Sequence, residues 1–142
     1  MECITYKEGY KYQLHEAYTV NIGDTMKPPY DITTDYIDFF ESGELVIKKG
    51  YAWDGPSGPT FDTKNFMRGS LVHDALYQLM REDKLSTDTY RNPADQLIRI
   101  MCREDGMSRF RARMVYIAVH RFGGPSSRSR NAKKKIKAPK GC

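Results

Sequence analysis

Residues 66–81 read FMRGSLVHDALYQLMR, and this stretch decides the fold of the second half of the chain. Its apolar side chains recur every three or four residues, which is the spacing of one helical face. They are Phe66, Leu71, Val72, Leu76, Leu79 and Met80. Asp62 or Thr63 precedes them as a candidate N-cap. The sequence therefore predicts a helix from about residue 64 to Arg81.

Two further helices follow this one. The second is expected to begin near Pro93, because proline suits the first helical turn, and to stop at Gly106. Its predicted buried side consists of Leu97, Ile98, Met101 and Cys102. The third is expected from Ser108 to Phe122, where Gly123-Gly124-Pro125 ends it. Its predicted core stripe consists of Phe110, Met114, Ile117, Ala118 and Phe122.

The residues before the first helix have a different composition. Residues 2–48 are rich in Tyr, Thr, Val and Ile and are broken by turn residues, which predicts short antiparallel strands. One hairpin is expected to join residues 10–14 to residues 17–22, and another strand, residues 45–47, follows the turn at Ser42-Gly43. Residues 50–62, GYAWDGPSGPTFD, hold too many glycines and prolines for a helix and predict an ordered loop. The fold class is thus α+β, with two antiparallel core helices in a single domain over residues 1–125.

The last residues, 126–142, carry seven basic side chains and no acidic one. Without those seven, 16 of the 23 basic residues remain against 18 acidic ones, so the body has a formal charge of about −2. This composition predicts a disordered basic tail that attracts nucleic acid or anionic lipid without specificity. It contains nothing that reads bases, which argues against sequence-specific DNA binding.

Other features exclude several protein classes. Cys3, Cys102 and Cys142 are odd in number and form no C-x-x-C pair, so neither a disulfide framework nor a zinc knuckle is expected. The first residues lack the order of a secretory signal, and no apolar run reaches 18 residues. A soluble protein made in a reducing compartment is expected.

The candidate chemistry lies on the first two helices. His73 and Tyr77 are four residues apart and share a helical face, and Asp74 points into the adjoining quadrant. If the helices pack antiparallel, Asp95 can accept a hydrogen bond from one imidazole nitrogen of His73. The other nitrogen is then free to take a proton from water. Asp74 would be available for a hard cation, together with oxygens of the loop upstream.

These residues resemble a known enzyme core. The order of D-G-P-x-G-P, then H-D-x-x-Y, then N-x-A-D is similar to phospholipase A2, most closely to the form in parvovirus capsid proteins, which lacks disulfides. The resemblance covers about residues 50–101. It implies that His73 activates water, that Asp95 orients it, and that Tyr77 belongs to the same catalytic group. It also implies that Asp74 holds Ca²⁺ with the loop residues Asp54, Gly55 and Ser57.

A second resemblance covers more of the chain. The chain is similar to an uncharacterised protein family of tailed bacteriophages and prophages. The similarity lies in the tyrosine-rich strands, the loop G-Y-A-W-D-G-P-S-G-P, the predicted helical residues 70–77 and the later Ala94-Asp95. This resemblance implies a viral source, and a location in the host cytoplasm or the virion. The expected partners are phospholipid membrane, which the first resemblance implies, or phage structural proteins, which the second implies.

Two classes of function follow from the sequence. The first is a metal-assisted hydrolase of phospholipid esters. The second is a non-enzymatic phage protein, either a virion or tail-assembly component or an inhibitor of host defence, in which the His-Asp pair only stabilises the fold. His15 and His120 lack a partner motif and are expected to be structural or at the surface. The arginines of the third helix, Arg109, Arg111, Arg113 and Arg121, are expected to form a solvated face or, together with the tail, to meet phosphate.

Overall fold

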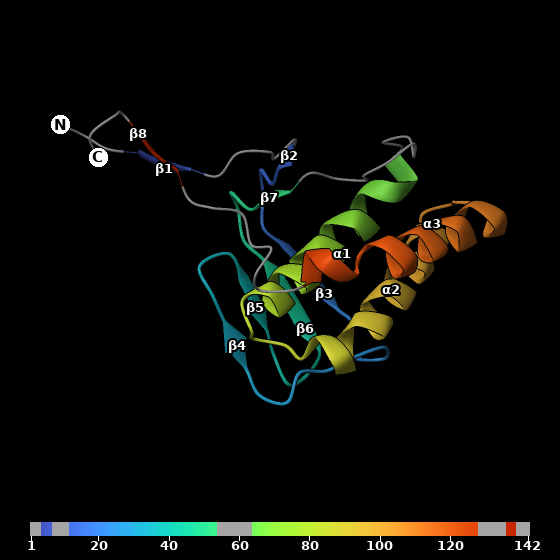
Figure 1. Ribbon diagram of the computed structural model, residues 1–142, viewed down its shortest axis with the longest axis horizontal. Coiled ribbons are helices and arrows are strands. Elements are labelled where there is room, and N and C mark those ends of the chain that lie inside the picture. The colour runs from blue at the N-terminus through green and yellow to red at the C-terminus, as the bar shows by residue number, and fades with distance from the viewer. Residues whose placement is uncertain (1–3, 7–11, 54–63, 128–135, 139–142) are drawn as a thin grey trace.

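The computed structural model describes residues 4–6, 12–53, 64–127 and 136–138, and Figure 1 shows short strands followed by three helices. The strands are β1 (Ile4–Tyr6), β2 (Tyr12–Gln13), β3 (Tyr18–Asn21), β4 (Ile32–Thr33), β5 (Ile37–Phe39), β6 (Glu44–Ile47), β7 (Ala52–Trp53) and β8 (Ile136–Ala138). The helices are α1 (Lys64–Arg81), α2 (Thr87–Glu104), α3 (Arg109–Phe122) and the 3₁₀ turn η1 (Gly124–Ser127). The predicted α+β class is confirmed.

The largest sheet has four strands in the order β3-β6-β5-β4, and each neighbouring pair is antiparallel. Gly43, at φ 92°, forms the turn between β5 and β6, so the predicted strand after Ser42-Gly43 is present. Burial alternates along β5 and β6, as expected for a sheet with one face on the core. The core side chains of this sheet are Ile32, Ile37, Phe39, Leu45 and Ile47.

The predicted hairpin between residues 10–14 and 17–22 is wrong. Strand β2 pairs with β7, where Tyr12 faces Trp53, and β3 pairs with β6, where Tyr18 faces Ile47. The chain leaves one sheet and enters another between β2 and β3. Both partners lie far along the sequence, and the hydrophobic pattern of a strand does not specify which strand it will pair with.

Helix α1 lies between the four-stranded sheet and α2 (Figure 1). Its burial extends around most of its circumference, because both layers cover it. Gly69 allows the two helices to approach, since a Cβ at this position would lie 3.2 Å from Cys102 Sγ and 3.2 Å from Ile98 Cγ1. The helix spans the predicted range, while its candidate caps Asp62 and Thr63 lie outside the described residues.

Helix α2 begins at Thr87 and not near Pro93, which lies inside it. Ser86 is the N-cap, with an extended backbone, and Asp88 places a negative charge in the first turn, where the helix dipole favours it. Pro93 therefore lies within α2, beyond the first turn where it was expected. The predicted stop is correct, because Gly106 has φ 98° directly after the C-cap residue.

Helix α3 begins after the N-cap Ser108, as predicted, but buries a different face. Phe110, Met114 and Ile117 of the predicted core stripe are 75%, 47% and 37% exposed, and Ala118 is exposed too. Nothing is described for the side chain of Phe122. The buried side consists of Ala112 and Val115, with Val119 partly buried beside them. Both sets are apolar at helical spacing, and the smaller side chains allow close packing on α2.

The segment predicted to be a disordered tail contains described structure. Ser127 is buried at the end of η1, and its hydroxyl donates to the carbonyl of Gly124 at 2.7 Å. Strand β8 pairs antiparallel with β1, so that Ile4 faces Ala138. Residues 127 and 136–138 are thus the part of the predicted tail that the structure describes, together with residue 126 of η1. None of the three described α-helices combines the length and hydrophobicity that a membrane-spanning helix requires.

Candidate functional site

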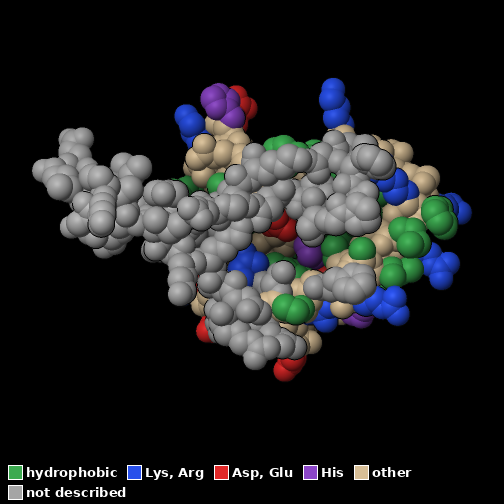
Figure 2. Space-filling view, turned by 45° about the horizontal axis from the view of Figure 1, so that its top comes forward, with side chains coloured by type: hydrophobic (Ala, Val, Ile, Leu, Met, Phe, Trp, Pro, Cys, Tyr) green, Lys and Arg blue, Asp and Glu red, His purple; other side chains and the backbone are tan. Residues whose placement is uncertain are grey.

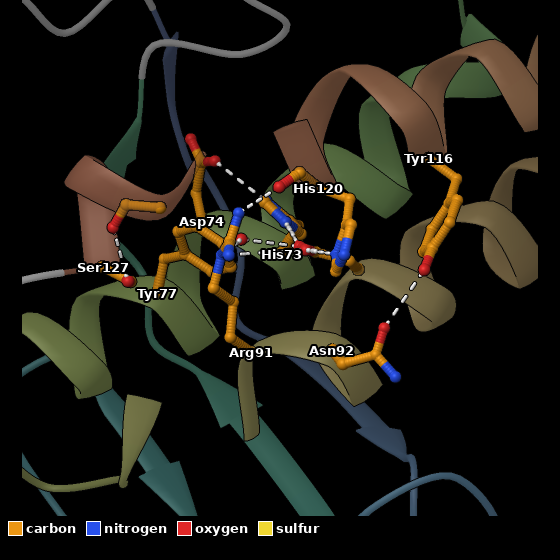
Figure 3. A network of polar contacts seen from close by, with 10 residues as sticks. His73, Asp74, Tyr77, Arg91, Asn92, Tyr116, His120 and Ser127 are labelled. Atoms are coloured by element: carbon orange, nitrogen blue, oxygen red, sulfur yellow. Dashed lines mark hydrogen bonds and ion pairs between the residues drawn. The ribbon is translucent and has the colours of Figure 1, made fainter. Parts of the chain in front are cut away.

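His73 and Asp95 meet in the middle of the interface between α1 and α2. Figure 3 shows His73 among the polar side chains of this interface. Nε2 of His73 lies 2.7 Å from Oδ1 of Asp95, as the sequence predicted from an antiparallel pair of helices. Both residues are buried, His73 to 6% exposure and Asp95 to 0%. The close approach at Gly69, one turn earlier on α1, lets these short side chains span the interface.

Tyr77 completes the group on the α1 side. Its hydroxyl donates to the same Oδ1 atom of Asp95 at 2.6 Å, and its ring lies 4.1 Å from the imidazole of His73, centroid to centroid. Arg91, one turn before Asp95 on α2, donates to the Tyr77 oxygen at 3.3 Å and to the carbonyl of His120. The side chain of His73 is thus fixed in position by a packed ring and a shared acceptor.

His120 is the residue that sequence reasoning missed. Its Nδ1 lies 3.2 Å from Oδ2 of Asp95, so a third helix contacts the same carboxylate (Figure 3). The ring stacks on Tyr116, whose hydroxyl donates to Asn92 at 3.1 Å. Tyr116 and His120 are four residues apart, the spacing of His73 and Tyr77, and this repeated pair was the available signal.

The charges of the group are mutually stabilising. Burial alone would raise the pKa of Asp95, but hydrogen bonds from His73 and Tyr77 lower it below its usual value. Burial alone would lower the pKa of His73, yet the carboxylates of Asp74 and Asp95 raise it. The pKa of Tyr77 is raised by burial and by Asp95, so it remains a donor. An ionised Asp95 can only accept, and Nε2 of His73 must therefore carry a proton.

Asp74 lies on the other side of the imidazole. Its Oδ1 is 3.8 Å from Nδ1 of His73, and its side chain is 32% exposed. Asp74 is the one predicted metal ligand within the described residues, because Asp54, Gly55 and Ser57 lie outside them. In the described ranges no group of three or more His, Cys, Asp or Glu side chains could hold a metal. The carboxylate oxygen of Asp74 suits a hard cation such as Ca²⁺, which would need its further ligands from elsewhere.

A cleft of about 330 Å³ opens on the His120 side of the group. It is lined by Thr87, Asp88, Arg91, Asn92, His120, Gly124 and Ser127. The side chain of His120 is 46% exposed, whereas that of His73 is 7% exposed. Asp95 thus connects one enclosed imidazole with one that faces an open cleft.

Comparison with known proteins identifies a family. A model of the family described as "Protein of unknown function (DUF1353)" matches residues 31–119, which is more than half of the chain. The match includes His73, Asp74, Tyr77 and Asp95 and ends one residue before His120. No curated protein and no solved structure matches the chain. On the family match, the chain belongs to the DUF1353 family of proteins of unknown function.

Proposed function

We propose that the protein is a hydrolase in which His73 is the general base and Asp95 orients it. The observation that carries this proposal is the 2.7 Å contact between His73 Nε2 and an ionised Asp95. This contact fixes the proton on Nε2 and leaves Nδ1 as the basic nitrogen. The hydroxyl of Tyr77 on the same oxygen keeps the carboxylate in place.

The reaction class follows from a base that activates water. Nδ1 takes a proton from water, the hydroxide attacks an ester carbonyl carbon, and the imidazolium then protonates the departing alcohol. The substrate class, phospholipid esters, comes from the resemblance to phospholipase A2. A Ca²⁺ ion held by Asp74 would stabilise the developing oxyanion. Its further ligands would come from Asp54, Gly55 and Ser57.

The arrangement of Asp74 supports a cation at this place. Its carboxylate lies close to Nδ1, and a neutral imidazole presents a lone pair there. Two electron-rich groups at 3.8 Å favour a positive charge between or beside them, either a proton on Nδ1 or a cation on Asp74. A bound cation would compensate the carboxylate and leave His73 neutral, which is the form that a general base requires.

The second candidate function is a non-enzymatic phage protein, acting in the virion, in tail assembly or against a host defence. The enclosure of His73 favours it, because the cleft next to the group is lined by His120 and not by His73. In this case Asp95 serves as a buried acceptor that joins α1, α2 and α3. The group then stabilises the fold and moves no proton.

Fatty-acid release from mixed phospholipid vesicles, with and without calcium, separates the two functions. The general base contributes typically 10² to 10⁴ in rate, so H73Q should lose that factor, while the exposed H15Q control should retain the wild-type rate. D74N should lose activity that high calcium partly restores. Calcium should also raise the melting temperature of the wild type. A wild type that neither exceeds H73Q in rate nor responds to any divalent ion would overturn the proposed hydrolase in favour of the second candidate.

A further inference from the structure

Helix α3 exposes a continuous apolar stripe that the fold does not use. Phe110, Met114 and Ile117 are 75%, 47% and 37% exposed. At 100° per residue these three side chains fall within about 60° of the helix circumference. The opposite side of α3, with Ala112 and Val115, already packs on the rest of the molecule. The helix therefore has two apolar faces, and only one of them contributes to the core.

The same helix is strongly basic. Its sequence RFRARMVYIAVHRF contains four arginines and no acidic residue. Arg109 and Arg113 follow one edge of the stripe, and Arg121 continues its line beyond Ile117. All three are exposed, and no carboxylate of the described residues forms an ion pair with them. Figure 2 shows hydrophobic side chains interspersed with Lys and Arg side chains at the end of the molecule that carries α3.

We infer that this face of α3 binds the surface of an anionic phospholipid bilayer. Apolar side chains flanked by arginines are the pattern of a helix that lies in the interface, with its apolar face about 5–10 Å deep and its cations at the headgroups. The guanidinium groups would contact lipid phosphates, while Phe110, the most exposed of the three, would insert furthest.

Two other occupants fit this face less well. A second copy bound through the same face would bring the arginines of one α3 against those of the other, with no acidic residue on either helix. A peptide helix would need a groove, and the cleft beside His120 is lined by other residues. The stripe lies on one helix whose other side is packed, which gives a convex surface. A lipid surface can cover such a ridge without a groove.

The inference deepens the proposed function, since it rests on a phospholipid substrate for its biological purpose. The binding itself needs neither His73 nor a cation. It is therefore measured in EDTA, by flotation of the full chain with phosphatidylcholine vesicles that contain or lack phosphatidylserine. Wild type and H73Q should bind the anionic vesicles equally.

Matched variants identify the surface. Neutralising two arginines, in R109Q/R113Q, should weaken binding about 25-fold, about fivefold for each charge. Removing the apolar contacts, in F110S/M114S, should weaken it about tenfold or more. The controls K49Q/K84Q and Y36S change exposed residues elsewhere in the molecule and should retain binding. Because the variants keep the basic tail, its contribution cancels in the comparison.

Insertion is measured separately with a tryptophan reporter. The emission of F110W should shift to the blue on anionic vesicles, while that of Y36W should not.

Equal responses of α3 variants and controls, or equal binding to neutral vesicles, would overturn the inference. A dimer in solution that F110S/M114S dissociates would overturn it in favour of a second copy. Vesicle binding without ester hydrolysis would leave the inference standing and remove the hydrolase. Hydrolysis of a soluble ester without vesicle binding would support the hydrolase and overturn the inference of membrane binding.

Discussion

Oδ2 of Asp95 lies 3.2 Å from Nδ1 of His120, while Oδ1 of the same carboxylate lies 2.7 Å from Nε2 of His73. The two imidazoles come from α3 and α1, and the carboxylate between them comes from α2. One fully buried side chain therefore joins all three helices. Its removal should affect stability whether or not the protein is an enzyme.

D95N should lower the free energy of unfolding by about 1–3 kcal/mol, because the amide keeps the shape of the carboxylate but not its charge. The measurement is urea denaturation at neutral pH. D105N is the matched control, since Asp105, the C-cap residue of α2, binds Arg68 of α1 in a partly exposed pair. Its loss should be about 1 kcal/mol or less. Equal losses in the two variants would contradict a central role for Asp95.

Y77F should cost about 1–2 kcal/mol, because it removes the buried hydroxyl that donates to Asp95 at 2.6 Å. The guanidinium of Arg91 also loses an acceptor. Y116F removes a hydroxyl that donates to Asn92 in a more exposed place and should cost less. Thermal unfolding of both variants gives the comparison, and a larger loss in Y116F would be inconsistent with the buried network.

The contribution of His73 to stability should depend on pH. Its pKa in the fold lies above the ordinary value of about 6.5, so its stabilisation is fully present below that value. It is lost as the pH rises through the raised pKa. The pKa of Asp95 is lowered, so its stabilisation is present above about 3.8 and is lost as the pH falls through the lowered value.

The stability difference between wild type and H73Q should therefore be largest between about pH 4 and pH 6.5 and should decrease at higher pH. Urea denaturation at pH 5.5 and at about pH 9 measures it. H15Q, at an exposed position, is the matched control variant. A difference that increases with pH would show that His73 is buried as a neutral group.

Truncations should show where the fold ends. A chain that ends at Ser127 loses the β1–β8 pairing but keeps η1, and should unfold within a few degrees of the full chain. A chain that ends at Gly123 also loses the buried Ser127 and the contact of Thr87 with its carbonyl. Its melting temperature should fall further, by about 4 °C for each kcal/mol lost. Equal melting temperatures would place η1 outside the cooperative unit.

The parts of the structure that local patterns could predict were those that one helix or one turn determines. The H-D-x-x-Y spacing placed His73 and Tyr77 on one face, and the order of the helices brought Asp95 to them. Apolar periodicity could not choose between the two faces of α3, because both have it. Ala112 and Val115 are buried because their small side chains allow α3 to pack closely on α2. Only the packing of the two helices shows this.

Other errors had a different physical origin. Proline fits the first turn of a helix best, but α2 includes Pro93 because Ser86 and Asp88 start the helix earlier. Tyr12 of β2 pairs with Trp53, 41 residues further on, and Asn21 of β3 pairs with Glu44, 23 residues further on. Strand pairing at such distances depends on the whole sheet. His120 reaches Asp95 because α3 folds back on α2, and the spacing of Tyr116 and His120 alone does not show that packing.

The close packing at Gly69 has a consequence for other members of the family. A methyl group at this position would need space that Cys102 Sγ and Ile98 Cγ1 occupy, each 3.2 Å away. Members with alanine at the equivalent of 69 are then expected to compensate with a smaller residue at the equivalent of 98 or 102. Such coupled substitutions would keep the helices at the distance where a histidine still donates a hydrogen bond to an aspartate 22 residues away.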